Sequence, residues 1–178
     1  MSAEQENKAD FINGRDIDLK LLSSVSAQLD SIGGMQLVVT GSYAIEILTG
    51  HQLKHEDMDT NIFVSNLSME IPKVASSMEG LSPPGLKLRL FKSTDDRLEY
   101  DVLPEQADSR RLEMLFVEAK EVEGSKGSYI LKDGSIVPTV LVPIKDSKDQ
   151  EYLFRVKSLP YNIATWAIRI SGVLEKPK

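Results

Sequence analysis

The sequence predicts an α/β (α+β) fold in which a mixed β-sheet is flanked by helices, and three observations lead to this prediction. Segments with apolar residues at helical spacing are interspersed with short β-branched runs and with stretches that alternate apolar and charged residues. With 41% hydrophobic and 27% charged residues, the composition is that of a globular protein. No repeat or linker interrupts the 178 residues. We therefore expect a flexible N-terminal tail at residues 1–14 and one domain over residues 15–178.

The order of the elements follows from local patterns along the chain. The first helix is ended by Gly33 and Gly34, and the third has Ser68 as its expected N-cap and Pro72 at an early interior position. Short polar or Gly-containing turns join several of the strands into hairpins. Helices are expected at residues 16–32, 43–48, 68–78 and 159–170, and strands at residues 35–39, 57–64, 86–91, 98–103, 111–122, 128–131, 136–142 and 153–156.

The composition restricts the chemistry that the chain can support. It has no cysteine and two histidines, so any metal must be held mainly by oxygen, which favours Mg²⁺, Mn²⁺ or Ca²⁺. A net charge of -6 argues against extended nucleic-acid binding, although a bound cation would still allow a nucleotide ligand. Residues 1–10 are polar, and no apolar run approaches the ~20 residues that span a bilayer. We expect a soluble, cytoplasmic protein with no membrane partner.

A Gly-Ser turn follows the first predicted strand. Residues 35–39 form a short buried strand, Thr40-Gly41-Ser42 breaks it, and residues 43–48 begin a helix. This order puts the backbone amides of Gly41 and Ser42 at a helix N-terminus, where an anion such as phosphate is stabilised.

A pair of aspartates, Asp57 and Asp59, comes next and provides the clearest chemical signal. Residues two apart on a strand point to the same face, so both carboxylates project together. Two adjacent anions favour a cation between them, although Asp-x-Asp pairs are also common on solvated surfaces. Asp101, in Glu-Tyr-Asp-Val, adds a third carboxylate on a later strand. Together with the Gly-Ser turn, these residues supply what phosphoryl transfer needs: phosphate donors, metal ligands and a carboxylate near the nucleophile.

The motifs at residues 39–52, Val-Thr-Gly-Ser-Tyr-Ala-Ile-Glu-Ile-Leu-Thr-Gly-His-Gln, and at residues 55–59, His-Glu-Asp-Met-Asp, resemble the signature of the nucleotidyltransferase superfamily. The branch that they resemble most is that of the aminoglycoside and lincosamide nucleotidyltransferases. The resemblance is specific over residues 39–64 and extends to Asp101. It implies a nucleotidyltransferase-like mixed β-sheet flanked by helices.

The resemblance also implies an activity and a role for each matched residue. Members of the family transfer a nucleoside monophosphate from a nucleoside triphosphate to a hydroxyl acceptor and release pyrophosphate. Gly41 and Ser42 would contact the triphosphate co-substrate, and Asp57 and Asp59 would bind Mg²⁺ or Mn²⁺. Asp101 would either join the metal ligands or activate the acceptor hydroxyl. The expected acceptor is a small molecule, with a protein or an RNA as the less favoured alternatives.

Two alternatives stay open at the level of the sequence. The fold could serve as a binding or regulatory module, such as a component of a toxin–antitoxin pair, or the acidic pair could be a solvated surface feature. Many members of the family continue into a helical substrate-binding domain that these residues do not match. Either the protein is a minimal version of the family, or a partner subunit or a second copy of the chain holds the acceptor.

Overall fold

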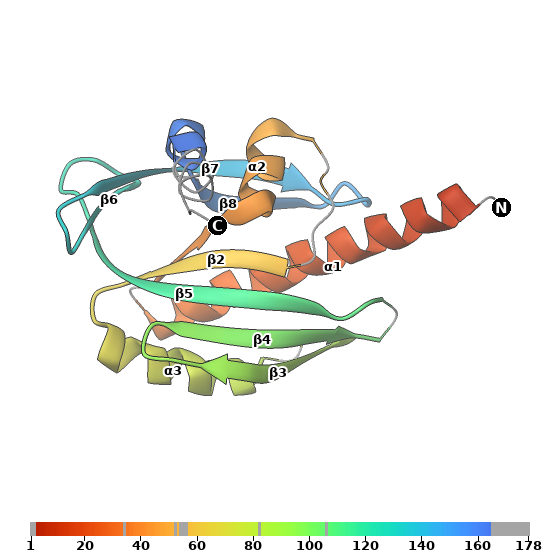
Figure 1. Ribbon diagram of the computed structural model, residues 1–178, viewed down its shortest axis with the longest axis horizontal. Coiled ribbons are helices and arrows are strands. Elements are labelled where there is room, and N and C mark those ends of the chain that lie inside the picture. The colour runs from red at the N-terminus through yellow and green to blue at the C-terminus, as the bar shows by residue number, and fades with distance from the viewer. Residues whose placement is uncertain are drawn as a thin grey trace, which may run out of the picture.

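The computed structural model describes residues 3–33, 35–51, 53, 57–81, 83–105 and 107–164. Within these ranges, eight strands form one connected mixed sheet that is flanked by helices (Figure 1), as the sequence predicts. The helices are α1 (Ala3–Ile32), α2 (Gly41–Thr49) and α3 (Leu67–Glu79), and the strands are β1 (Gln36–Val39), β2 (Asp57–Val64), β3 (Leu86–Ser93), β4 (Arg97–Pro104), β5 (Arg110–Glu121), β6 (Ser128–Leu131), β7 (Ile136–Lys145) and β8 (Glu151–Lys157).

The first helix begins earlier than residue 16, where the sequence predicts its start. Helix α1 begins at Ala3, and its first turns extend beyond the sheet (Figure 1). Residues 3–8, Ala-Glu-Gln-Glu-Asn-Lys, are mostly good helix formers, and extending an existing helix needs no new nucleus. A polar composition is therefore compatible with a helix that begins at Ala3.

The start of α3 also differs from the prediction. Its N-cap is Asn66, not Ser68, because the Asn66 side chain accepts a hydrogen bond from the Met69 backbone amide at 3.3 Å. Glu70 completes this cap by accepting from the Asn66 amide at 3.3 Å and from the preceding Ser65 amide at 2.9 Å. The helix continues through Pro72, which lies on its exposed side.

The strand order is β2-β1-β8-β7-β6-β5-β4-β3, with an additional pairing of β2 with β5. Strands β1 and β2 are antiparallel, whereas β2 and β5 are parallel over the whole length of β2. The long strand β5 pairs with β2 and β4 through its first part and with β6 through its last residues. The pairing with β5 joins β2, the first strand of this order, to the third strand from its other end, so that β2 has a neighbour on both sides.

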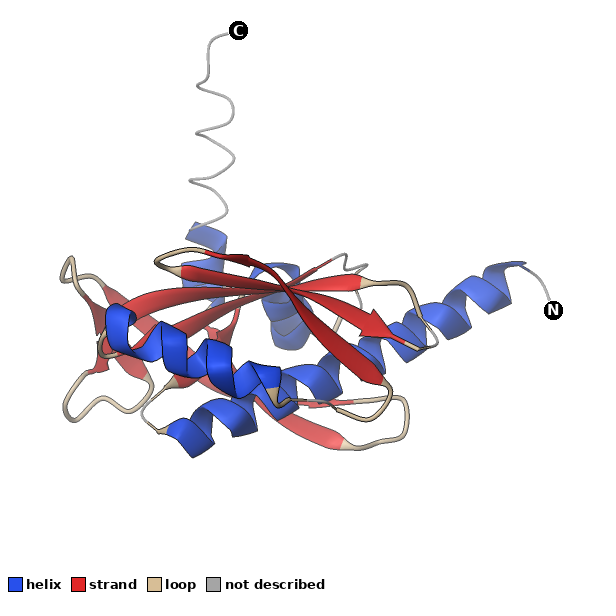
Figure 2. Ribbon diagram, turned by 90° about the horizontal axis from the view of Figure 1, so that it is seen from below, coloured by secondary structure: helices blue, strands red, loops and turns tan. Residues whose placement is uncertain are grey.

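The two faces of the sheet have different environments. The helices α1, α2 and α3 contribute to the main hydrophobic cluster, which packs against one face of the strands. We call the other face the open face. A small cluster of Val38, Phe63, Tyr129 and Val137 lies there, and Tyr161 packs against it. Residues 159–164 are helical and lie on the opposite side of the sheet from α1 and α3 (Figure 2). The rest of the helix predicted at residues 159–170 lies outside the described residues.

None of the described helices combines the length and the apolar character needed to cross a bilayer.

Candidate functional site

The Gly-Ser turn lies where β1 passes into α2. Strand β1 ends at Val39, whose partner on β2 is Thr60, and the next amide, that of Thr40, donates to the Asp59 carbonyl at 2.9 Å. Gly41 then takes a left-handed conformation with φ +62°. A Cβ at this position would overlap Asp59 Oδ2. Glycine therefore serves two purposes here, because it allows the turn and it lets the Asp59 carboxylate approach the backbone.

Helix α2 begins at this turn, as the motif predicts. Its N-cap is Thr40, whose side chain makes no capping hydrogen bond. The first amides of an α-helix have no partner within the helix, and the helix dipole adds positive character there. The turn is thus suited to an anion, and the Asp59 carboxylate already lies beside it.

Asp57 and Asp59 share the open face of β2. Asp57 is exposed and Asp59 is half-buried, whereas Met58 and Thr60 between and after them are buried. The alternation of burial agrees with side chains that point to opposite faces in turn. Two of the residues before the pair, His55 and Glu56, lie outside the described residues.

Asp101 lies on the same face but two strands away. Strand β5 separates it from β2, and Arg111 on β5 is the register partner of both Asp57 and Asp101. Arg89 donates to Asp101 Oδ2 through Nη2 at 2.7 Å, and Arg111 Nη2 donates to Oδ1 at 3.5 Å. The hydrogen bond from Arg89, with the charge of Arg111, holds the pKa of Asp101 below its usual value. A carboxylate held in this way is a weak proton acceptor near neutral pH.

Glu113 lies nearer to the acidic pair than Asp101 does, because its strand β5 is adjacent to β2. It lies opposite Asp59 on the adjacent parallel strand β5, so the two backbones are about 4.8 Å apart. Its carboxylate forms an ion pair with Arg97, with 3.1 Å between Oε1 and Nη1. Sequence reasoning missed Glu113, because only the pairing of β2 with β5 brings it beside Asp59.

Among the described residues, no three Asp, Glu or His side chains are gathered closely enough to form a metal-binding group.

A buried polar network supports the turn from the helical side. Asp18 on α1 is 0% exposed and accepts from Tyr43 Oη at 2.5 Å and from Arg110 Nη1 at 2.6 Å. Tyr43 directly follows the Gly-Ser turn, and Arg110 begins β5. Burial and the neighbouring Asp18 carboxylate raise the pKa of Tyr43. Gly14 makes room for Arg110, since a Cβ there would overlap its guanidinium.

A second buried carboxylate anchors the connection from α2 to β2. Glu46 accepts from Arg15 Nε at 2.6 Å and from the Leu53 amide at 3.0 Å. Both carboxylates join segments that are far apart in the sequence, and the local pattern around them gives no sign of this role.

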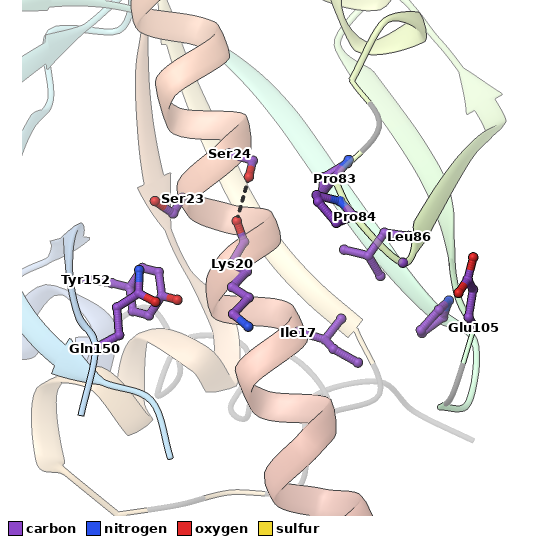
Figure 3. Close-up of a pocket in the computed structure, with 12 residues that line it drawn as sticks. Ile17, Lys20, Ser23, Ser24, Pro83, Pro84, Leu86, Glu105, Gln150 and Tyr152 are labelled. Carbon is purple, nitrogen blue, oxygen red and sulfur yellow. Dashed lines mark hydrogen bonds between the residues drawn. The ribbon is translucent and has the colours of Figure 1, made fainter. Parts of the chain in front are cut away.

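A separate open cavity of about 580 Å³ lies on the helical side. Figure 3 shows Lys20 reaching from α1 between Tyr152 on one wall and the turn at Pro83 and Pro84 on the other. Its lining includes none of the residues that the sequence predicted for the site, so this cavity is distinct from the Gly-Ser turn.

Comparison with known proteins assigns no family. No protein-family model and no curated protein matches the chain. Among solved structures, the chain is similar to a candidate nucleotidyltransferase from H. pylori, with a TM-score of 0.46, 12% identity, and coverage of 84% of this chain and 56% of that one. It is also similar to the Helicobacter pylori protein JHP933, with a TM-score of 0.43, 14% identity, and coverage of 82% and 53%. The chain spans about half the length of these two structures, and they do not single out the aminoglycoside and lincosamide branch.

Proposed function

We propose that the protein is a metal-dependent nucleotidyltransferase, which moves a nucleoside monophosphate from a nucleoside triphosphate to a hydroxyl acceptor. The observation that supports this most strongly is the contact between the Asp59 carboxylate and the Gly41 turn at the N-terminus of α2. It sets a ligand suited to Mg²⁺ beside a backbone suited to phosphate.

The turn and the acidic pair would bind different parts of the metal–triphosphate complex. The amides of Gly41 and Ser42 would hold phosphate oxygens, and Asp57 and Asp59 would hold Mg²⁺ or Mn²⁺. Two carboxylates are a sufficient protein contribution, because Mg²⁺ commonly takes one or two carboxylates together with substrate phosphates and water. When bound, the cation supplies charge neutralisation for the phosphate oxygens.

The transfer itself is a displacement at the α-phosphorus. A bond forms between the acceptor oxygen and this phosphorus, and the bond from the phosphorus to the bridging oxygen of the β-phosphate breaks. The electron pair of the broken bond leaves with pyrophosphate, and the proton of the acceptor hydroxyl passes to a base.

Two residues are candidates for the third carboxylate that takes this proton or completes the metal site. Asp101 is the sequence-based candidate, and Glu113 is favoured by its register with Asp59. Asp101→Asn and Glu113→Gln, compared in turnover and in nucleotide affinity, separate them. Loss of the base should lower turnover by about 10²–10⁴-fold and leave nucleotide affinity unchanged. Loss of a metal ligand should lower both turnover and nucleotide affinity.

Titration calorimetry with ATP, GTP, CTP and UTP in the presence of Mg²⁺ tests the proposal. We expect at least one of them to bind, and Asp59→Asn to weaken this binding. Asp149→Asn is the matched control, because this aspartate is highly exposed and is distant in sequence from Asp59. Its φ is 63°, a conformation that asparagine tolerates. If no nucleotide binds more tightly than about 1 mM, or if both variants behave alike, the proposal fails.

A second candidate function is a binding or regulatory module, such as one component of a toxin–antitoxin pair. The engagement of Asp101 by Arg89 and Arg111 favours it, because this carboxylate is then structural. Transfer of a labelled nucleoside monophosphate in a cell extract distinguishes the two functions. A labelled product would exclude a module that only binds, and it would identify the acceptor directly.

A further inference from the structure

A band of charged residues crosses the open face beside Asp57. In register order it runs from Asp57 on β2 through Arg111 on β5 and Asp101 on β4 to Arg89 on β3. Register partners share a face, and neighbouring strands are about 4.8 Å apart. The band therefore extends roughly 14 Å from the proposed metal ligand to the edge of the sheet.

An exposed aromatic ring belongs to this band because of a β-bulge. The register of β3 against β4 shifts between Leu90 and Lys92, which leaves Phe91 without a partner. Such a bulge redirects the side chain at its position. Phe91 is 55% exposed, and the guanidinium carbon of Arg111 lies 4.0 Å from the centroid of its ring, although Arg111 is two strands away. The ring thus lies over β4 on the open face.

Asp101 orients the two arginines next to this ring. It accepts from Arg89 through both Nε at 3.2 Å and Nη2 at 2.7 Å, and from Arg111 on its other oxygen. This arrangement fixes the plane of the Arg89 guanidinium, while the Arg89 side chain stays 69% exposed. A guanidinium has five N–H groups, so the two hydrogen bonds to Asp101 do not exhaust its donors.

We infer that Arg89, Phe91 and Arg111 form a subsite for a nucleotide unit of the acceptor, with its base stacked on Phe91 and its phosphate beside Arg89. This inference rests on the proposed function, because Arg111 in the subsite is the register partner of Asp57, a proposed metal ligand. Stacking on an aromatic ring and pairing with an arginine are the two interactions that such a unit uses. With a net charge of -6, the protein suits one such unit rather than a long strand. In this assignment Asp101 is a positioning residue.

The test measures binding of AMP by titration calorimetry in EDTA, without nucleoside triphosphate. Adenosine and ribose 5-phosphate supply the base and the phosphate separately, and an oligoribonucleotide of about 8 residues tests whether the unit is a strand end. We expect AMP to bind more tightly than either half. Phe91→Leu and Arg89→Gln should each weaken AMP binding by at least about fivefold. If the oligoribonucleotide binds more tightly than AMP, the unit is the end of a strand, and otherwise it is a free nucleotide.

Two control variants match these changes. Lys126→Gln removes one positive charge from an exposed position in the loop between β5 and β6. Leu90→Ala removes an exposed apolar side chain next to Phe91, from a residue whose register partner Tyr100 faces the core. Neither should change AMP binding. Equal affinities for AMP and adenosine, or equal losses in the control and test variants, would overturn the subsite.

A separate titration with Mg²⁺ and nucleoside triphosphate distinguishes this inference from the proposed function. Phe91→Leu and Arg89→Gln should leave triphosphate binding unchanged, whereas Gly41→Ala should weaken triphosphate binding and leave AMP binding unchanged. Loss of triphosphate binding in Phe91→Leu would show that the ring holds the donor base, and the assignment to the acceptor would be wrong. Absence of triphosphate binding in the unaltered protein would remove the proposed function while AMP binding still reports on the subsite.

Discussion

Replacing Gly14 by alanine should destabilise the protein, although the same change in an ordinary helix stabilises it. Alanine in place of glycine favours a helix by about 1 kcal/mol. At this position, however, the new Cβ would overlap the Arg110 guanidinium, which donates to Asp18 at 2.6 Å. The guanidinium would have to shift, and we expect this shift to break the hydrogen bond that its Nη1 donates to Asp18, which is 0% exposed. Removing one partner of a buried ion pair costs about 3–5 kcal/mol, so the net loss is about 2–4 kcal/mol.

Thermal unfolding followed by circular dichroism measures this loss. For a chain of this size, 1 kcal/mol lowers Tm by about 2–4 °C, so Gly14→Ala should lower it by roughly 5–15 °C. Gly80→Ala is the control, because its φ is -86° and the nearest atom to a new Cβ is 3.8 Å away. A Gly14→Ala protein as stable as the unaltered one would refute the reasoning, since Arg110 would then have another way to reach Asp18.

Three further predictions concern the turn, the arginine pair and the cap of α3. Gly41→Ala should cost about 1–2 kcal/mol because φ is +62°, and it should displace Asp59, so calorimetry should show weaker triphosphate binding together with a lower Tm. The folded-state pKa of Asp101 lies below its unfolded value, so its stabilising contribution is present above the unfolded pKa and is lost as the pH falls through the folded one. Carboxyl NMR titration should therefore show a higher pKa for Asp101 after Arg89→Gln, and an unchanged pKa would contradict the pairing. Asn66→Ala removes the cap of α3 and should cost about 1 kcal/mol, which a denaturant titration would detect as a lower midpoint.

Local patterns were sufficient to predict most of the elements. The strand at residues 57–64 has the predicted bounds, and polar and apolar residues alternate from Asp57 to Asp59 at its start. The Gly-Ser turn before a helix, and the shared face of Asp57 and Asp59, also follow from spacing within a few residues. The start of α1 and the cap of α3 were missed, because composition alone does not fix where a helix begins.

The relations that depend on distant parts of the chain could not be predicted. The parallel pairing of β2 with β5 brings Glu113 opposite Asp59, and no periodicity within either strand specifies its partner. In the same way, Asp18 and Arg110 are 92 positions apart, and each looks like an ordinary polar residue in its own segment. The spacing of Asp101 gave no sign that two arginines hold it. The roles predicted for Gly41, Ser42, Asp57, Asp59 and Asp101 stay predictions until ligand binding is measured.

The pairing of β2 with β5 also has a consequence for self-association. It gives both sides of β2 a neighbour, and it leaves β3, the last strand of the order, with a free edge. A free edge is a template on which a second chain can add a strand. Here Lys87, Arg89 and Lys92 make that edge positively charged, and the bulge at Phe91 interrupts its regular hydrogen-bonding pattern. The irregularity that brings an aromatic ring onto the open face therefore also protects the sheet from edge-to-edge aggregation.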